Sequence, residues 1–262
     1  MKKYITIVLV GILALSCFKD KTEKKGFQVR EITEDEQGKK IVGLPIDSLQ
    51  FETRPRNVLL TYNNAHRLTP IYKVNYDKRT KKPYTGSNAF HTNWEDDNDK
   101  DGNNWNNNFM PGFEAVYGYN FVNISHFNNE TKTENTFFEN PVLVKTLYYP
   151  AFSKDTLNFE PVKRNFYMVS VYDEDSNNDG FINAKDLRRL YGFDINGKNK
   201  KTLVPKNYSV MSSEYDPAND FMYIFAKKDQ NQNGQMELNE PTNVFWIDLK
   251  NLDNNGRQYG NE

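Results

Sequence analysis

Short hydrophobic segments alternate with polar, turn-forming stretches from about residue 41 to the end of the chain. The segments are rich in aromatic and β-branched residues, which is typical of β-strands. They cover residues 57–62, 71–76, 142–149, 166–172, 221–226 and 244–249. Hydrophobic spacing of helical period is hard to find after the N-terminal region, and the best candidate, residues 184–190, covers one or two turns. The pattern predicts an all-β fold.

Parts of this pattern repeat at a fixed spacing. Residues 167–172 (YMVSVY) precede 221–226 (FMYIFA) by 54 positions (221 − 167 = 54). Residues 190–195 (LYGFDI) precede 244–249 (VFWIDL) by the same offset, and a polar loop lies between the two segments of each copy. A repeated supersecondary unit indicates a repeat architecture. We therefore predict repeated antiparallel hairpins, each with a polar loop between its strands.

The polar loop of the first copy matches a calcium-binding loop position by position. Such a loop has oxygen ligands at positions 1, 3, 5 and 9, glycine at 6, a backbone carbonyl ligand at 7 and a closing carboxylate at 12. The ligand positions hold Asp175, Asn177, Asp179, Phe181, Asn183 and Asp186, and Gly180 stands at position 6. The pattern predicts Ca²⁺ as a cofactor at residues 175–186.

The loop of the second copy fits the same pattern. Its ligand positions hold Asp229, Asn231, Asn233, Gln235, Glu237 and Glu240, and Gly234 stands at position 6. Pro241 follows where a hydrophobic residue usually continues the chain. For both loops the alternative is an Asn- and Asp-rich turn that binds no metal.

A third, degenerate copy stands upstream. Asp97, Asp99 and Asp101 occupy positions 1, 3 and 5, and a glycine follows at position 6. Asn108 stands where the closing carboxylate is expected, so a site here is either weaker or completed from elsewhere in the fold. Residues 116–121 are then the strand that follows this loop.

The first loop resembles the loops of the EF-hand family and the calcium segment of dockerin modules, in which a D-x-N-x-D-G stretch leads to an Asp-Leu pair such as Asp186-Leu187. Both families place a helix after the loop, and EF-hands place another before it. The segments 166–172 and 244–249 beside the two loops are strand-like instead. They argue against an EF-hand or dockerin fold, and against a target groove or docking to a cohesin.

The sequence around the loops is similar to the blades of bacterial WD40-like propellers of the TolB C-terminal type. The resemblance covers about residues 160–250 and rests on LYGFDINGKNKKTLVP, SSEYDPANDFMYIFA and VFWIDLKN. In such blades an aromatic-aspartate-aliphatic-x-Gly turn links an outer strand to the next blade. The resemblance implies a β-propeller-like fold with calcium loops inserted between neighbouring strands. Roughly 50 residues per unit leaves room for about four units, so closure of the ring stays open.

Charge and motifs narrow the classes of function. The balance of 34 Lys and Arg against 35 Asp and Glu gives no electrostatic reason to expect nucleic acid as a partner. His66, His91 and His126 are too far apart in sequence for a local metal motif such as H-E-x-x-H. The sequence has no G-x-S-x-G elbow and no Walker-type phosphate loop. We therefore expect a non-catalytic protein.

The first residues resemble a bacterial lipoprotein signal. A basic start is followed by a hydrophobic run at residues 5–15, which at about 1.5 Å per residue is too short for a hydrocarbon core of roughly 30 Å. Cys17, the only cysteine, ends this segment, and the resemblance makes it the lipidated first residue of the mature chain. The alternative is an ordinary secretory signal with an incidental cysteine.

These features predict a signal peptide at residues 1–16, a lipid anchor and charged tether at 17–40, and a β-repeat domain at 41–262. Phe27, Val29 and Ile32 are able to add a first edge strand within the tether. Phe18 stands where an inner-membrane retention signal has aspartate. Resemblance to Gram-negative sorting rules therefore implies the outer membrane, reached through the lipid anchor.

The leading hypothesis is a calcium-binding, non-catalytic cell-envelope lipoprotein in which calcium has a structural role. A second hypothesis is a polysaccharide-acting enzyme with structural calcium, marked by a cleft with two carboxylates about 5–10 Å apart. A third is a module that binds a glycan or a protein through an exposed aromatic patch. Trp94, Trp105 and Trp246 are candidates for such a patch, and packing in the core or along a strand is their alternative role.

Overall fold

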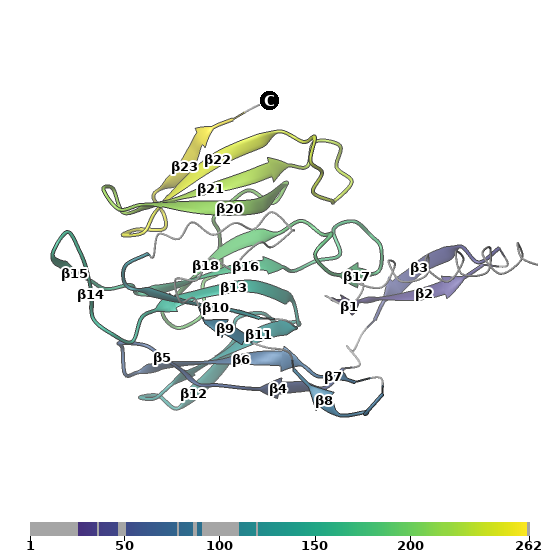
Figure 1. The fold of residues 1–262 in the computed structure, drawn as a ribbon, viewed down its shortest axis with the longest axis horizontal. Helices are drawn as coiled ribbons and strands as arrows, with labels where there is room; N and C mark the ends of the chain where they lie inside the picture. Colours follow the sequence, from purple (N-terminus) through teal and green to yellow (C-terminus); the bar gives the residue numbers. More distant parts are fainter. Residues whose placement is uncertain are drawn as a thin grey trace, which may run out of the picture.

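The computed structural model describes residues 26–35, 37–46, 51–77, 79–85, 88–90, 110–118 and 120–260. Within these ranges every regular element is a β-strand, and the paired strands are antiparallel. The strands form three larger sheets stacked face to face, with small two-stranded ribbons at their margins (Figure 1). The predicted all-β fold of repeated antiparallel hairpins is confirmed.

The middle sheet has six strands in the order β19-β18-β16-β13-β10-β9. They are β9 (Asn88–Phe90), β10 (Phe113–Gly118), β13 (Leu143–Pro150), β16 (Phe166–Tyr172), β18 (Arg189–Asp194) and β19 (Lys201–Thr202). All seven residues of β16 are buried. This strand is hydrophobic almost throughout, rather than alternating, because the sheet is covered on both faces.

An outer sheet lies on each side of the middle sheet, the four-stranded one at the top of Figure 1 and the five-stranded one at the bottom. The four-stranded sheet runs in chain order through β20 (Tyr208–Asp216), β21 (Phe221–Lys228), β22 (Thr242–Asp248) and β23 (Asn255–Tyr259). The five-stranded sheet contains β4 (Thr53–Pro55), β5 (Leu59–Leu60), β6 (His66–Lys73), β11 (Phe121–Asn128) and β12 (Thr133–Thr136). Buried and half-buried residues alternate along β6, as expected for a strand with one covered face.

Four two-stranded ribbons complete the described structure. They pair β1 (Phe27–Gln28) with β17 (Phe181–Ile182), β2 (Arg30–Glu34) with β3 (Lys40–Pro45), β7 (Asn75–Tyr76) with β8 (Pro83–Tyr84), and β14 (Asp155–Leu157) with β15 (Glu160–Val162). Strands β1 and β2 lie where Phe27, Val29 and Ile32 indicated an edge strand. Regular structure therefore begins well before residue 41, inside the stretch whose charge pattern predicted a tether.

Two hydrophobic clusters fill the spaces between the sheets. Met168 of β16 belongs to the cluster shared with the four-stranded sheet, which includes Met222 and Ile224. Its neighbours on the strand, Tyr167 and Val169, belong to the cluster shared with the five-stranded sheet. Successive side chains of a strand point to opposite faces, so a single strand contributes to both clusters.

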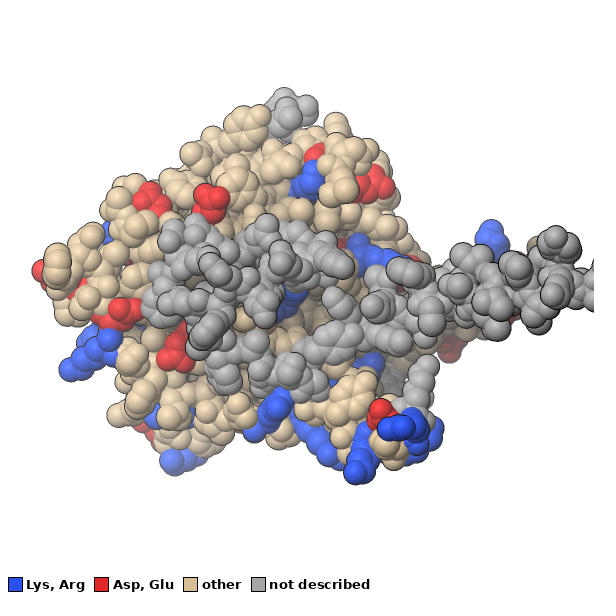
Figure 2. Space-filling model, in the orientation of Figure 1, with Lys and Arg blue, Asp and Glu red and all other residues tan. Residues whose placement is uncertain are grey.

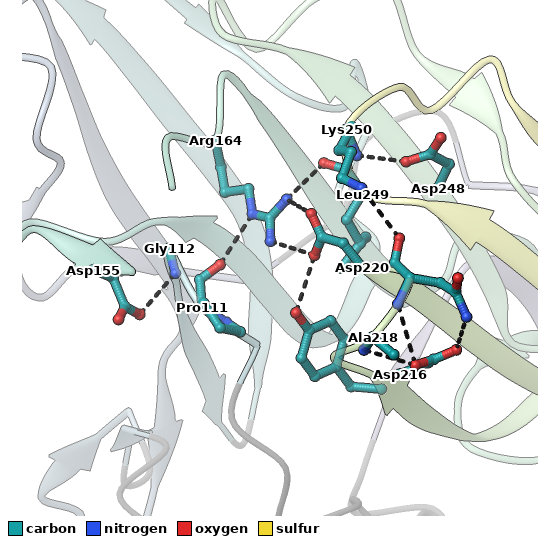
Figure 3. A network of polar contacts seen from close by, with 12 residues as sticks. Pro111, Gly112, Asp155, Arg164, Asp216, Ala218, Asp220, Asp248, Leu249 and Lys250 are labelled. Carbon is teal, nitrogen blue, oxygen red and sulfur yellow. Dashed lines mark hydrogen bonds and ion pairs between the residues drawn. The ribbon is translucent and has the colours of Figure 1, made fainter. Parts of the chain in front are cut away.

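A buried ion pair fastens the four-stranded sheet to the rest of the molecule (Figure 3). The guanidinium of Arg164, which precedes β16, donates to both carboxylate oxygens of Asp220 at 2.7 and 2.8 Å. Asp220 lies in the turn between β20 and β21, and the two side chains are 2% and 3% exposed. The guanidinium also donates to the carbonyls of Leu249 (2.8 Å) and Pro111 (3.0 Å). One side chain thus joins three segments of the chain.

The 54-residue repeat corresponds to two equivalent hairpins. β16 pairs with β18, and β21 pairs with β22, and a loop of the predicted kind connects the strands of each pair. The helical turns considered for residues 184–190 are not formed. β18 begins at Arg189, because its backbone groups pair with those of β16 instead.

Candidate metal centre

The first loop, between β16 and β18, folds around the carboxylate of Asp175. Its Oδ1 accepts a hydrogen bond from the amide of Asp179 (2.9 Å), and its Oδ2 accepts one from the amide of Gly180 (3.0 Å). The side-chain oxygen of Asn177 also accepts from the Asp179 amide (2.9 Å). Asp179 Oδ1 in turn accepts from the amide of Phe181 (3.0 Å). The loop's own backbone therefore holds the oxygen-bearing side chains at positions 1, 3 and 5.

Asp186 closes the first loop from its far end. Its Oδ2 accepts from the amide of Asn183 (2.8 Å), and its Oδ1 accepts from the amide of Asn177 (3.3 Å). The side-chain oxygen of Asn183 accepts from the amide of Lys185 (2.7 Å). Asp186 is only 1% exposed. The structure thus brings the predicted positions 3, 9 and 12 together.

The second loop, between β21 and β22, repeats this network. Asp229 accepts from the amides of Asn233 (3.1 Å) and Gly234 (3.0 Å). Asn231 accepts from the Asn233 amide (3.0 Å), and Asn233 accepts from the amide of Gln235 (2.8 Å). Each of these contacts has its counterpart at the same positions of the first loop.

The closing carboxylate of the second loop is Glu240. Its Oε1 accepts from the amide of Gln230 (3.1 Å), and its Oε2 accepts from the amide of Glu237 (3.0 Å). The Glu237 carboxylate accepts from the side-chain amides of Asn231 (3.0 Å) and Asn233 (3.1 Å). In this loop the side chain at position 9 is therefore hydrogen-bonded to the side chains at positions 3 and 5.

Both loops use the same unusual backbone conformation. At position 4, Asn178 and Gln232 have φ values of 56° and 57°, and at position 6, Gly180 and Gly234 have φ values of 90° and 71°. This left-handed region suits glycine and is uncommon for other residues. Two loops of different sequence have thus adopted one local fold.

The carboxylates of the first loop lie close enough together for their negative charges to repel one another. Burial, and then the negative charges of Asp175 and Asp179, raise the pKa of Asp186 to about 7, against the opposing effect of the amides of Asn183 and Asn177. Burial also raises the pKa of Asp175. A bound cation would relieve this repulsion, which is the electrostatic pattern expected of a cation site.

Two basic side chains lie beside the first loop. Arg30 Nε is 3.3 Å from Asp175 Oδ2, and its side chain is 36% exposed. Lys185 Nζ is 3.9 Å from Asp179 Oδ2. Near the second loop, Lys227 Nζ donates to the backbone carbonyls of Leu238 and Glu240, at 2.7 Å each. The first loop therefore carries an ion pair on its position-1 carboxylate.

The two loops contact each other, which no sequence signal indicated. The hydroxyl of Ser176 donates to the carbonyl of Gly234 (2.6 Å) and accepts from the amide of Leu187 (2.8 Å). Asp186 and Gln235 form an antiparallel β-bridge between the loops. A β-carbon on Gly234 would lie 1.9 Å from the Ser176 carbonyl oxygen, so only glycine allows this approach.

The chemistry of these residues fits calcium. Calcium takes carboxylate, side-chain amide and backbone carbonyl oxygens together, and each loop offers all three. In the described ranges, no group of three or more His, Cys, Asp or Glu side chains is arranged to hold a metal by itself. An ion here would therefore depend also on Asn177 and Asn231 and on the carbonyls of Phe181 and Gln235.

Several predicted residues lie outside the described ranges. They are Cys17, the upstream loop residues Asp97, Asp99 and Asp101, and Trp94 and Trp105. Trp246 is described, and its ring stacks on Phe221 at 5.1 Å between centroids. That contact corresponds to the packing alternative for this tryptophan.

A buried histidine pair was missed by sequence reasoning. His66 Nδ1 and His126 Nε2 are 2.9 Å apart, between β6 and β11, and the residues are 6% and 1% exposed. Burial lowers the pKa of both side chains. Sixty positions separate them (126 − 66 = 60), so only the pairing of the two strands brings them together.

Figure 2 shows acidic and basic side chains together on the visible face of the described residues.

Neither the protein-family models nor the curated proteins compared with this chain give a match. Among solved structures, the chain is similar to a quinonprotein alcohol dehydrogenase-like protein from Bacteroides thetaiotaomicron, with 8% identity, over 90% of this chain and 76% of that one, at a TM-score of 0.19. A similarity this low carries no information about activity.

Proposed function

We propose that this chain is a calcium-binding, non-catalytic cell-envelope lipoprotein, in which calcium stabilises the β-sheet domain. The observation that carries the proposal is the shared hydrogen-bond network of the two loops. In both, the residue at position 1 accepts from positions 5 and 6, position 3 accepts from 5, position 5 accepts from 7, and position 12 accepts from 9. Asn- and Asp-rich turns that bind no metal would not be expected to share the same set of hydrogen bonds in both loops.

A structural role follows from where the loops lie. Each loop connects two paired strands of one sheet, so an ion bound to both ends of the loop fastens those strands to each other. Extracellular sites of this loop type bind calcium at about 10⁻⁴–10⁻³ M, which suits a stabilising ion rather than a signal. Since the ion binds the folded loop and not the unfolded chain, binding and folding are coupled.

Calcium binding is tested by native mass spectrometry and titration calorimetry on the mature chain. We expect at least two ions per chain, and Asp175→Ala and Asp229→Ala should each remove one, because position 1 supplies a ligand. Magnesium should compete poorly, since it requires a smaller octahedral shell. Asp253→Ala, in a turn outside both loops, is the control that should retain both ions. A stoichiometry of zero or one at millimolar calcium refutes the proposal.

The envelope location rests on the N-terminal sequence. No helix in the described ranges is long and apolar enough to cross a membrane, and the proposed attachment is the lipid on Cys17. Cys17→Ala should abolish fatty-acid labelling and leave an uncleaved or soluble precursor, whereas Asp229→Ala should be labelled normally. Cleavage away from the Ser16–Cys17 bond, or unchanged membrane partitioning of Cys17→Ala, contradicts this part of the proposal.

A further inference from the structure

The N-terminal strand, which here means residues 26–34 with β1 and β2, lies directly against the first loop. β1 pairs with β17, which occupies positions 7 and 8 of that loop, with Phe27 opposite Ile182 and Gln28 opposite Phe181. The amides of Val29 and Arg30 both donate to the carbonyl of Gly180, at 2.9 and 3.3 Å. The strand therefore contacts the loop at positions 6, 7 and 8.

Hydrophobic side chains also pack between the N-terminal strand and the first loop. Phe27 is 3% exposed and belongs to a small hydrophobic cluster with Ile182. A β-carbon on Gly26 would lie 2.1 Å from the Ile182 carbonyl oxygen, so the backbones approach as closely as glycine permits. On the other side, the Ile32 side chain lies against Gly180, 3.0 Å from the place of a β-carbon there. Strands β1 and β2 thus cover the glycine turn of the loop.

The N-terminal strand contacts the same loop residues that a bound calcium ion would hold in place. Position 7 binds calcium through its backbone carbonyl, and position 6 makes the sharp turn that allows it. In this loop the two positions are Phe181 and Gly180, which the N-terminal strand also holds. An interaction that fixes the conformation of these two residues therefore favours both calcium binding and docking of the strand.

Arg30 acts in the opposite direction, because its positive charge on Asp175 disfavours a nearby cation. Its effect is limited, since the side chain is 36% exposed and screened by solvent. The strand pairing, the two bonds to Gly180 and the burial of Phe27 are contacts that do not involve this charge.

We propose that the N-terminal strand is part of the first calcium site, so that calcium at residues 175–186 holds residues 26–34 onto the domain and loss of the ion releases them. The inference rests on the proposed calcium function and adds its consequence. By thermodynamic linkage, calcium and the docked strand strengthen each other by the same factor. The segment that leads from the N-terminus would then be fastened to the domain by the ion.

Hydrogen exchange measures docking of the strand. In the full chain, the amides of residues 27–30 should exchange at least about tenfold more slowly with calcium than with chelator. Asp175→Asn should exchange fast in both conditions, whereas the matched variant Asp229→Asn, altered only in the second loop, should keep the calcium response. If native mass spectrometry shows two bound ions but exchange at 27–30 does not change, this inference is wrong and the proposed calcium function stands. If no ion binds, both fail.

The reciprocal experiment measures calcium affinity. Gly26→Ala places a β-carbon against the Ile182 backbone and should weaken binding at the first loop by the factor found in exchange, while the second loop reports that the domain is folded. Ile32→Ser removes the cover of Gly180 and should act in the same direction. Asp253→Ala, in a turn outside both loops and outside residues 26–34, is the control that should keep the parent affinity. Equal affinity in Gly26→Ala, Ile32→Ser and the parent chain overturns the linkage.

Discussion

Replacement of Arg164 by methionine should destabilise the protein far more than loss of a surface ion pair. The guanidinium is 2% exposed and Asp220 is 3% exposed, so the substitution leaves a carboxylate buried without its counter-charge. The contact from Tyr215, whose hydroxyl is 3.1 Å from Asp220 Oδ1, is neutral and does not replace that charge. The carbonyls of Leu249 and Pro111 also lose a donor (Figure 3).

Removal of one partner of a buried ion pair costs about 3–5 kcal/mol. For a chain of this length, each kcal/mol lowers the melting temperature by about 2–4 °C, so Arg164→Met should melt about 6–20 °C lower. The double variant Arg164→Met with Asp220→Asn should recover much of the loss, because no charge then remains buried. Asparagine suits this position, since Asp220 has a φ of 61°.

Calorimetry and urea unfolding of the three forms supply the measurement. The control is Lys201→Met, which breaks a pair of 2.6 Å whose side chains are 48% and 70% exposed. An exposed pair contributes about 0–1 kcal/mol, so this control should hardly change stability despite its short distance. If Arg164→Met costs no more than Lys201→Met, the argument from burial is refuted.

Three further outcomes are expected. Chelation should lower the melting temperature by about 6–12 °C, because two sites at tenfold their dissociation constants add about 3 kcal/mol, and a calcium-induced rise in hydrophobic-dye binding would contradict the structural role. Arg30→Gln should tighten the first loop about twofold to fivefold at low ionic strength, with the gain lost at high salt; a salt-independent affinity excludes the electrostatic reasoning. Because burial lowers the pKa of His66 and His126, these two side chains bind more protons in the unfolded chain than in the folded one below about pH 6.5, so their contribution to stability should fall as the pH drops through that value. His126→Gln should reduce this fall in urea titrations between about pH 7 and 5, and an unchanged slope rules out the pair as its source.

The sequence alone predicted the two loops and the strands on either side of them, because the information for both is local. Asp175 reaches Gly180 and Asp186 reaches Asn177 within a single twelve-residue loop, so spacing in the sequence is enough to specify the network. The strand at residues 166–172 was predicted with the bounds of β16, since a run of buried residues marks a strand covered on both faces. The same local reasoning was wrong at residues 184–190, where pairing of β18 with β16 overrides a weak helical pattern.

Tertiary structure decided the contacts between distant segments. The bridge from Asp186 to Gln235, the ion pair of Arg30 with Asp175 and the contact of His66 with His126 each join residues whose separation leaves no periodic signal. Such contacts depend on which sheet faces are covered and how the sheets stack, and many arrangements share one hydrophobic pattern. The sequence therefore specified each calcium-type loop by itself, while stacking of the sheets placed the two loops and the N-terminal strand in contact.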